Sequence, residues 1–175
     1  MSKIETLAEG TYLGLYKQEN WEFAKRPNST ACVGILPILN GDSIILIEQY
    51  RIPTQSKVIE IPAGLAGDEP EHAAESLADT AKRELIEETG YSGNITLLIA
   101  SPTSPGMTPE LTHLFAATEL TKIAKGGGVH GEEIISHIVP LAELDTFLSE
   151  KQSQGYDIDF KIHASLWIAQ NKNLI

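Results

Sequence analysis

Three glutamates crowd the end of one amphipathic segment, where their spacing suits a metal site. Glu84, Glu87 and Glu88 stand shortly before Gly90. On a helix, positions three and four apart are neighbours, so Glu84 would lie beside both of the others. Carboxylate oxygens are the ligands that magnesium prefers in proteins. The group therefore predicts a magnesium site, with manganese as a substitute ion.

The position of these acids on a helix is unfavourable unless something binds them. Leu77, Ala81 and Leu85 form an apolar stripe at helical spacing, and Glu84 and Glu88 fall close to that stripe. The carboxyl end of a helix carries partial negative charge, so each acid there costs roughly 0.3 kcal/mol or more. Repulsion between neighbouring acids adds a similar cost. A solvated acidic face is the alternative, but the apolar register favours a bound cation.

The sequence around these glutamates resembles a known family. Residues 83–91 read Arg-Glu-Leu-Ile-Glu-Glu-Thr-Gly-Tyr, which matches the core of the Nudix box, R-E-U-x-E-E-x-G-U, where U is bulky and apolar. Glu75 precedes this core at the spacing of the first glutamate of the box. The fixed glycine of the box is expected where the chain has Glu69. We take Gly64 as its counterpart, which implies an insertion between Gly64 and Glu75.

The resemblance implies a role for each matching residue. Glu84 and Glu88 would be the main magnesium ligands, with Glu87 near a second ion or its waters. The main-chain carbonyl of Ala63 would be a further metal ligand, and Arg83 would orient a glutamate across the helix turn. A pyrophosphate resists attack because its charge repels the nucleophile, and bound cations remove that barrier. We therefore expect magnesium-dependent hydrolysis of a pyrophosphate.

Two segments before the box resemble the ADP-ribose and nucleoside-diphosphate-sugar pyrophosphatases. In residues 21–26, the resemblance implies that Trp21 stacks on the nucleobase and that Arg26 helps to hold the nucleotide. In residues 48–51, Glu-Gln-Tyr-Arg, it implies that Arg51 contacts a phosphate. The alternatives are that Trp21 is an ordinary core residue and that Arg51 closes a surface salt bridge.

Two segments after the box resemble the same branch. Pro105 and Gly106 follow the box glycine at a spacing associated with ADP-ribose hydrolysis, although Pro-Gly is most simply a turn. Glu132 and Glu133 resemble the loop that brings a catalytic glutamate to the metal. We expect Glu132 to be the general base and Glu133 to be its less favoured substitute. The glycine run at 126–128 would give the loop the flexibility to close over substrate.

The leading substrate is ADP-ribose, which would yield AMP and ribose 5-phosphate. An ADP-, UDP- or GDP-hexose is the nearest alternative, because the insertion could reshape the pocket. A Nudix module that binds a nucleotide sugar without cleaving it is another, but the presence of all three box glutamates counts against it. Members of this branch are commonly homodimers whose N-terminal segments contribute to the partner's site. We therefore expect residues 1–28 to take part in dimerisation and in base binding.

The composition indicates a single domain and limits the kinds of partner and the cellular location that we expect. The 175 residues suit a single domain, 1–175, with 42% hydrophobic and 21% charged residues. A formal net charge of −11 argues against nucleic acid and anionic membrane as partners. Cys32 has no second cysteine to pair with, which favours a reducing compartment. With neither an N-terminal signal pattern nor an apolar run of the roughly 18 residues that a membrane helix needs, the cytoplasm is the expected location.

The elements that position these residues follow from periodicity and turn signals. Nearly continuous apolar runs predict buried strands, and a helical period that stops at Gly90 predicts the helix that carries the box. The fold class is α/β (α+β), a Nudix-type α/β/α sandwich with a mixed central sheet and an N-terminal hairpin. The predicted strands are 10–16, 21–25, 32–39, 43–50, 57–61, 95–100, 112–118 and 134–139, and the predicted helices are 73–89, 141–149 and 160–169.

Overall fold

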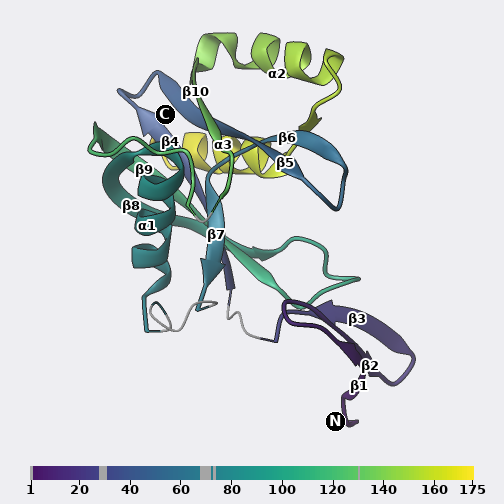
Figure 1. The fold of residues 1–175 in the computed structure, drawn as a ribbon. Helices are drawn as coiled ribbons and strands as arrows, with labels where there is room; N and C mark the ends of the chain where they lie inside the picture. The colour runs from purple at the N-terminus through teal and green to yellow at the C-terminus, as the bar shows by residue number, and fades with distance from the viewer. Residues whose placement is uncertain (1, 28–30, 68–71, 73, 130) are drawn as a thin grey trace.

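The computed structural model describes residues 2–27, 31–67, 72, 74–129 and 131–175 (Figure 1). Its main sheet has the strand order β11-β6-β5-β4-β9-β8, with β7 joined to β4 and β10 joined to β5. β4 runs parallel to β9 and β6 runs parallel to β11, whereas the other pairs are antiparallel, so the expected mixed sheet is confirmed. The strands are β4 (Ala31–Leu39), β5 (Ser43–Arg51), β6 (Ser56–Glu60), β7 (Ala63–Ala66), β8 (Tyr91–Pro102), β9 (Leu111–Lys122), β10 (Ile135–Pro140) and β11 (Asp157–Ile158).

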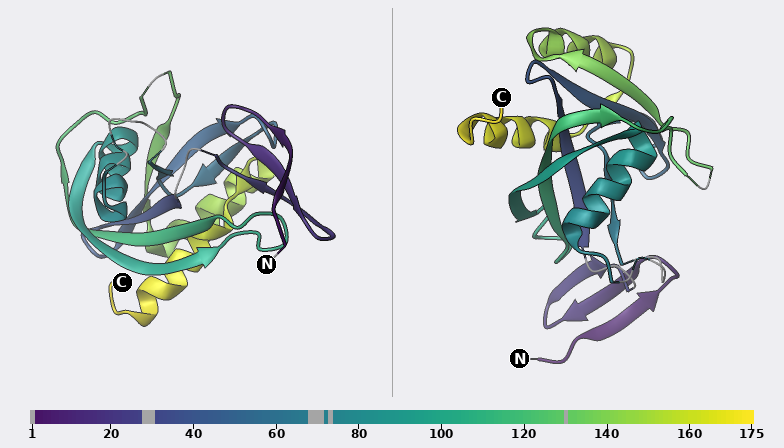
Figure 2. Two further views of the ribbon diagram at one scale, coloured as in Figure 1. Left: turned by 90° about the horizontal axis from the view of Figure 1, so that it is seen from below. Right: turned by 90° about the vertical axis from the view of Figure 1, so that its left-hand side faces the viewer.

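Helices cover both faces of this sheet, as expected for the sandwich. Figure 2 shows α1 on one side of the sheet and α3 on the other. Along β4, Val33 and Ile35 pack against α1, while Leu36 and Ile38 face the cluster that contains residues of α2 and α3. β4 is therefore buried on both faces, which is why its sequence is a continuous apolar run. The helices are α1 (Leu77–Thr89), α2 (Leu144–Ser153) and α3 (Phe160–Asn171), with the short 3-10 helix η2 (Leu141–Glu143) before α2.

The N-terminal segment forms a separate three-stranded antiparallel sheet of β1 (Glu5–Glu9), β2 (Gly14–Gln18) and β3 (Trp21–Lys25). It lies at one end of the main sheet, where the chain begins (Figure 1). The backbone N–H of Ala24 donates to the carbonyl of Met107 at 2.8 Å, so β3 contacts the loop between β8 and β9. The predicted hairpin is confirmed, and β1 extends it by one strand.

Several predicted boundaries were wrong for identifiable reasons. β1 was missed because all of its residues are exposed, so it shows no inward-facing pattern. The predicted strand 10–16 begins later, as β2. The helix was predicted to start at residue 73, a position outside the described residues. α1 begins at Leu77 because the side chain of Ser76 caps it and accepts from the Asp79 N–H at 3.2 Å. Among the described residues, no helix is long and apolar enough to cross a membrane.

Candidate active site

The carboxyl end of α1 is closed by backbone groups from the loop that follows β9. Gly90 ends the helix in a left-handed conformation, φ 76°. The N–H groups of Gly127 and Gly128 donate to carbonyls of the last turn at 2.9 and 3.0 Å, and the ammonium of Lys122 donates to the Thr89 carbonyl at 2.6 Å. These donors offset the negative helix end beside the glutamates. In this structure the glycine run also packs closely against α1.

Glu84 and Glu88 reach from α1 to the start of β7. A Cβ atom at position 64 would lie 2.1 Å from Oε1 of Glu84, so the absence of a side chain on Gly64 gives the carboxyl group its space. Glu88 is only 3% exposed, and its Oε2 accepts from the Ala63 N–H at 3.1 Å. The helix register predicted from the apolar stripe thus turns both carboxylates toward the sheet.

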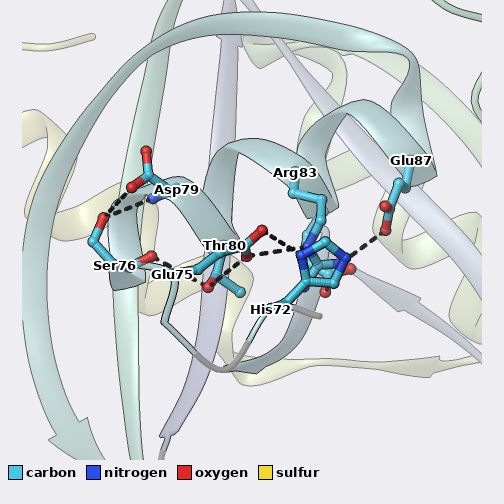
Figure 3. Close-up of polar contacts among 8 residues, drawn as sticks. His72, Glu75, Ser76, Asp79, Thr80, Arg83 and Glu87 are labelled. Carbon is cyan, nitrogen blue, oxygen red and sulfur yellow. Dashed lines mark hydrogen bonds and ion pairs between the residues drawn. The ribbon is translucent and has the colours of Figure 1, made fainter. Parts of the chain in front are cut away.

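Arg83 contacts several glutamates of α1 and of the residues just before it (Figure 3). Its guanidinium contacts Oε2 of Glu75 at 3.3 Å, Oε1 of Glu84 at 3.0 Å and Oε2 of Glu87 at 3.0 Å. Glu75 also lies 2.6 Å from Nδ1 of His72. Arg83 therefore orients glutamates on more than one turn of the helix, through the planar fork that arginine offers and lysine lacks.

The oxygen atoms at this end of α1 are of the chemical type that a hard divalent cation binds. Burial raises the pKa of Glu84 to about 7, against the opposing effect of Arg83, and burial also raises the pKa of Glu88 well above its ordinary value. A cation beside them would favour the ionised forms of both, and carboxylate and carbonyl oxygens are suitable ligands. Within the described part of the chain, no three acidic, histidine or cysteine side chains converge as a metal site. Glu84 and Glu87 point to Arg83 instead, and Glu88 points to the Ala63 N–H.

A cavity of about 690 Å³ opens beside these groups, and it is lined by residues far apart in the sequence. Its volume suits a ligand of nucleotide size. Both acidic and basic side chains line it, so it can hold an anionic ligand together with a cation despite the acidic composition of the chain. The predicted residues that line it are Arg26, Arg51, Ala63, Arg83, Glu84, Glu87 and Glu132.

Both predicted substrate-binding arginines in this cavity have carboxylate partners. Arg51 contacts Oε2 of Glu60 at 2.8 Å, and Arg26 contacts Oε1 of Glu110 at 2.9 Å. The arginine side chains remain 37% and 38% exposed. The salt bridge considered as an alternative for Arg51 is therefore present, with a buried partner in the cavity wall, and the phosphate contact of Arg51 stays a prediction.

Only one of the two candidate bases lines the cavity. Glu132 does so from the loop before β10, where its carboxylate accepts from the Val129 N–H at 3.4 Å and its own N–H donates to the Val129 carbonyl at 3.0 Å. Its charge acts on Glu84 and Glu88 across the cavity and raises the pKa of each. Glu133 is exposed and is not part of the lining.

Three predicted substrate-binding residues lie outside this cavity. Trp21 is 60% exposed, and its Nε1 donates to the Gly106 carbonyl at 3.3 Å. Pro105 and Gly106 are exposed in the loop between β8 and β9. Trp21 is therefore not the ordinary core residue considered as an alternative. The three residues meet where the N-terminal sheet touches that loop, and their role in base binding stays a prediction.

The cavity also contains residues that the sequence did not single out. Glu60 is buried at the end of β6, and a charged residue at the end of an apolar strand is the signal that could have revealed it. Lys161, in the first turn of α3, and Tyr12, before β2, also line the cavity. Nothing in the local pattern marks these two, because chain topology alone brings them to the site.

Comparison with known proteins identifies the class to which this fold and site belong. Residues 28–159 match the NUDIX domain, and the chain belongs to the Nudix family. The chain is 34% identical over 135 residues to an ADP-ribose pyrophosphatase of Bacillus subtilis (strain 168), covering 75% of this chain and 68% of that protein. It is 35% identical over 135 residues, with the same coverage, to a methanol dehydrogenase activator of Bacillus methanolicus.

A crystal structure of an ADP compounds hydrolase has the same fold, with a TM-score of 0.74 at 22% identity over 97% of this chain and 90% of that one. The expected resemblance to the ADP-ribose and nucleoside-diphosphate-sugar pyrophosphatase branch is confirmed, as is the class of enzyme, a Nudix pyrophosphohydrolase.

Proposed function

We propose that the protein hydrolyses the pyrophosphate bond of a nucleoside diphosphate sugar, with ADP-ribose as the leading substrate. The observation that supports it best is that one cavity is lined both by Glu84, Glu87 and Glu132 and by Arg26 and Arg51. Such a cavity combines acids for a cation with arginines for phosphates. The relative named as an ADP-ribose pyrophosphatase supports this choice of substrate.

Each acidic residue has a distinct part in the proposed reaction. Magnesium, or manganese in its place, would supply charge neutralisation for the diphosphate and would acidify a water. Glu84, Glu88 and the Ala63 carbonyl would hold it, with Glu87 serving a second ion. Glu132 accepts the proton of the attacking water, as a general base within reach of the cavity.

The basic residues bind and orient the substrate. Arg51 gives up part of its contact with Glu60, and Arg26 part of its contact with Glu110, to donate hydrogen bonds to phosphate oxygens. Phosphate accepts the same pair of parallel N–H donors from a guanidinium as a carboxylate does. Arg83 keeps its glutamates in place. Water then attacks one phosphorus and the bridging oxygen leaves with the other, so ADP-ribose yields AMP and ribose 5-phosphate.

We also propose that the protein is a homodimer in the cytoplasm. Apolar side chains of the N-terminal sheet region are exposed, and a second copy would cover them through residues 1–28 and bring base-binding groups to the partner's cavity. The exposed side chains are Ile4, Leu7, Leu13, Leu15 and Trp21, between 41% and 60% exposed. Sedimentation equilibrium of the full chain tests this part, and a monomer at micromolar concentration would contradict it.

The test of function is release of phosphomonoester from a panel of nucleotides, assayed with magnesium, with manganese and with chelator. The panel contains ADP-ribose, ADP-glucose, UDP-glucose, GDP-mannose and NADH. We expect metal-dependent cleavage of ADP-ribose, lost in Glu88→Gln and retained in Glu150→Gln, which removes an equal charge from an exposed position on α2. Tight binding of a panel member without cleavage would identify a binding module and overturn the proposal.

A further inference from the structure

A second cavity, of about 880 Å³, shares a wall with the active site. Arg51 and Glu60, in contact at 2.8 Å, line both cavities. Beyond this pair, the second cavity lies between the turn that joins β5 to β6 and the chain between α2 and α3. These segments are adjacent because β11 pairs with β6 at the edge of the sheet (Figure 1).

The lining of the second cavity differs in chemistry from that of the first. Asp157, Thr54 and Gln152 supply oxygen acceptors for hydroxyl groups. The Asp159 carboxylate also lines the cavity, but it is engaged by the N–H and the ammonium of Lys161. Among the described residues of the lining, Arg51 is the one lysine or arginine. Such a surface disfavours a group rich in phosphate and favours a neutral group with many hydroxyls, such as a sugar.

The active-site cavity is richer in basic side chains. Arg26, Arg83 and Lys161 line it in addition to Arg51, and so does Tyr12. Cations and an aromatic ring suit the phosphate and base of a nucleotide. In a nucleoside diphosphate sugar, the diphosphate joins the nucleoside at one end to the sugar at the other. Arg51 lines both cavities, one suited to the nucleotide and the other to the sugar.

We propose that the second cavity is the subsite for the sugar of the substrate, and that Asp157 and Thr54 select which sugar it takes. This inference rests on the proposed function and adds the element of specificity. Arg51 then contacts the diphosphate at the junction of the two cavities, and the scissile bond lies on the α1 side of Arg51.

The wall of the second cavity is held in place by contacts of its own. The Ser56 hydroxyl donates to the carboxylate of Asp157, and Asp157 pairs with Val58 in the parallel ladder. Tyr156 donates through its hydroxyl to Glu48 at 3.1 Å, and this buried carboxylate also accepts from two lysine ammonium groups at 2.8 Å. A wall fixed in this way can discriminate among sugars, because its acceptors are ordered before the substrate binds.

The test compares kcat/KM for ADP-ribose and ADP-glucose with that for the β-methyl ester of ADP, which has the same adenosine diphosphate but a methyl group in place of the second sugar. Asp157→Asn and Thr54→Val are measured separately, each with circular dichroism to verify the fold. The matched control is Asp42→Asn, since Asp42 is also exposed and also accepts from a serine hydroxyl, but lies in the turn between β4 and β5.

We expect at least one of the two variants to lower kcat/KM for the sugar substrates about tenfold more than for the methyl ester, as expected when a hydroxyl loses its partner. The control should leave that ratio unchanged. If the wild type cleaves the substrates but both variants keep its ratio between sugar and methyl ester, the inference is overturned while the proposed function stands. If the wild type cleaves none of them, the proposed function itself fails.

Discussion

The carboxyl group of Glu84 occupies the space that a side chain at position 64 would need. A Cβ atom on Gly64 would lie 2.0 Å from Cδ and 2.1 Å from Oε1 of Glu84. Because Gly64 belongs to β7 and Glu84 to α1, this close approach couples the sheet to the helix at the cavity. The conformation of Glu84 therefore depends on the absence of a side chain on a different element.

Gly64→Ala should displace Glu84 and abolish most of the activity. The added methyl group must push away the carboxyl group or separate β7 from α1, and overpacking of this kind costs about 1–3 kcal/mol of stability. We expect kcat to fall at least a hundredfold in the hydrolysis assay, and the midpoint of urea unfolding to fall as well.

A double-mutant cycle attributes this effect to the contact with Glu84. Glu84→Ala removes every atom within 2.5 Å of the added methyl group, so Gly64→Ala should cost much less stability in that background. If Gly64→Ala lowered the stability equally in both backgrounds, the added methyl group would be clashing with residues other than Glu84.

The stability of the metal-free protein should fall as the pH rises from about 4.5 to 7. Burial raises the pKa of Glu84 from 4.5 to about 7, so the folded protein keeps a proton that the unfolded chain has released. Linkage then lowers the free energy of unfolding through this window, by up to about 3 kcal/mol, and the decline ends above the folded pKa. Glu88, whose pKa is also raised, contributes with the same sign.

Urea unfolding in chelator at a series of pH values measures this effect. Glu84→Gln should show a flatter profile than the wild type, because its side chain carries no titratable proton. The difference between the two profiles isolates Glu84 from the histidines and the other carboxylates. Identical profiles for the two proteins would contradict the assignment.

Trp21→Ala should weaken substrate binding without slowing the chemical step. A base stacked on an indole contributes about 1–3 kcal/mol, which corresponds to a rise in KM of roughly 5- to 160-fold. Trp21→Phe should retain most of the affinity because a ring remains. Trp167→Ala is the matched control, since Trp167 is 67% exposed on α3 and outside the cavity. An unchanged KM in Trp21→Ala would remove this residue from the site.

The sequence predicts those parts of the fold in which side-chain patterns reflect burial. β4 and β5 are found because their apolar runs are buried on both faces, and α1 is found because its helical period ends at Gly90. β1, β7 and β11 are short or exposed and join their sheets mainly through backbone hydrogen bonds, which every residue type except proline can donate. Their side chains therefore carry too little signal.

Some residues of the candidate site can be predicted from the sequence and others cannot. Glu84, Glu87 and Glu88 lie on one helix, whose geometry fixes their relative positions once the helix is recognised. Lys161 reaches the cavity from α3, and only the path of the whole chain brings it there. The contact between Trp21 and Gly106 likewise joins elements whose meeting no local pattern predicts. Arg26, Arg51 and Glu132, which come from other elements, were predicted only through the family resemblance. Residues outside both the helix and the resembling segments were missed.

Glu132→Gln should remove most of the activity, whereas Glu133→Gln should leave turnover within about twofold of the wild type. The two substitutions make the same change of charge at adjacent positions, but only Glu132 lines the cavity. Loss of a general base typically costs about 10²–10⁴ in kcat. Removal of the Glu132 charge should also lower the pKa of Glu84, which that charge raises, and carboxyl titration by NMR measures this shift. A normal turnover in Glu132→Gln together with a loss in Glu133→Gln would reverse the assignment, because the exposed neighbour would then have to enter the cavity when substrate binds.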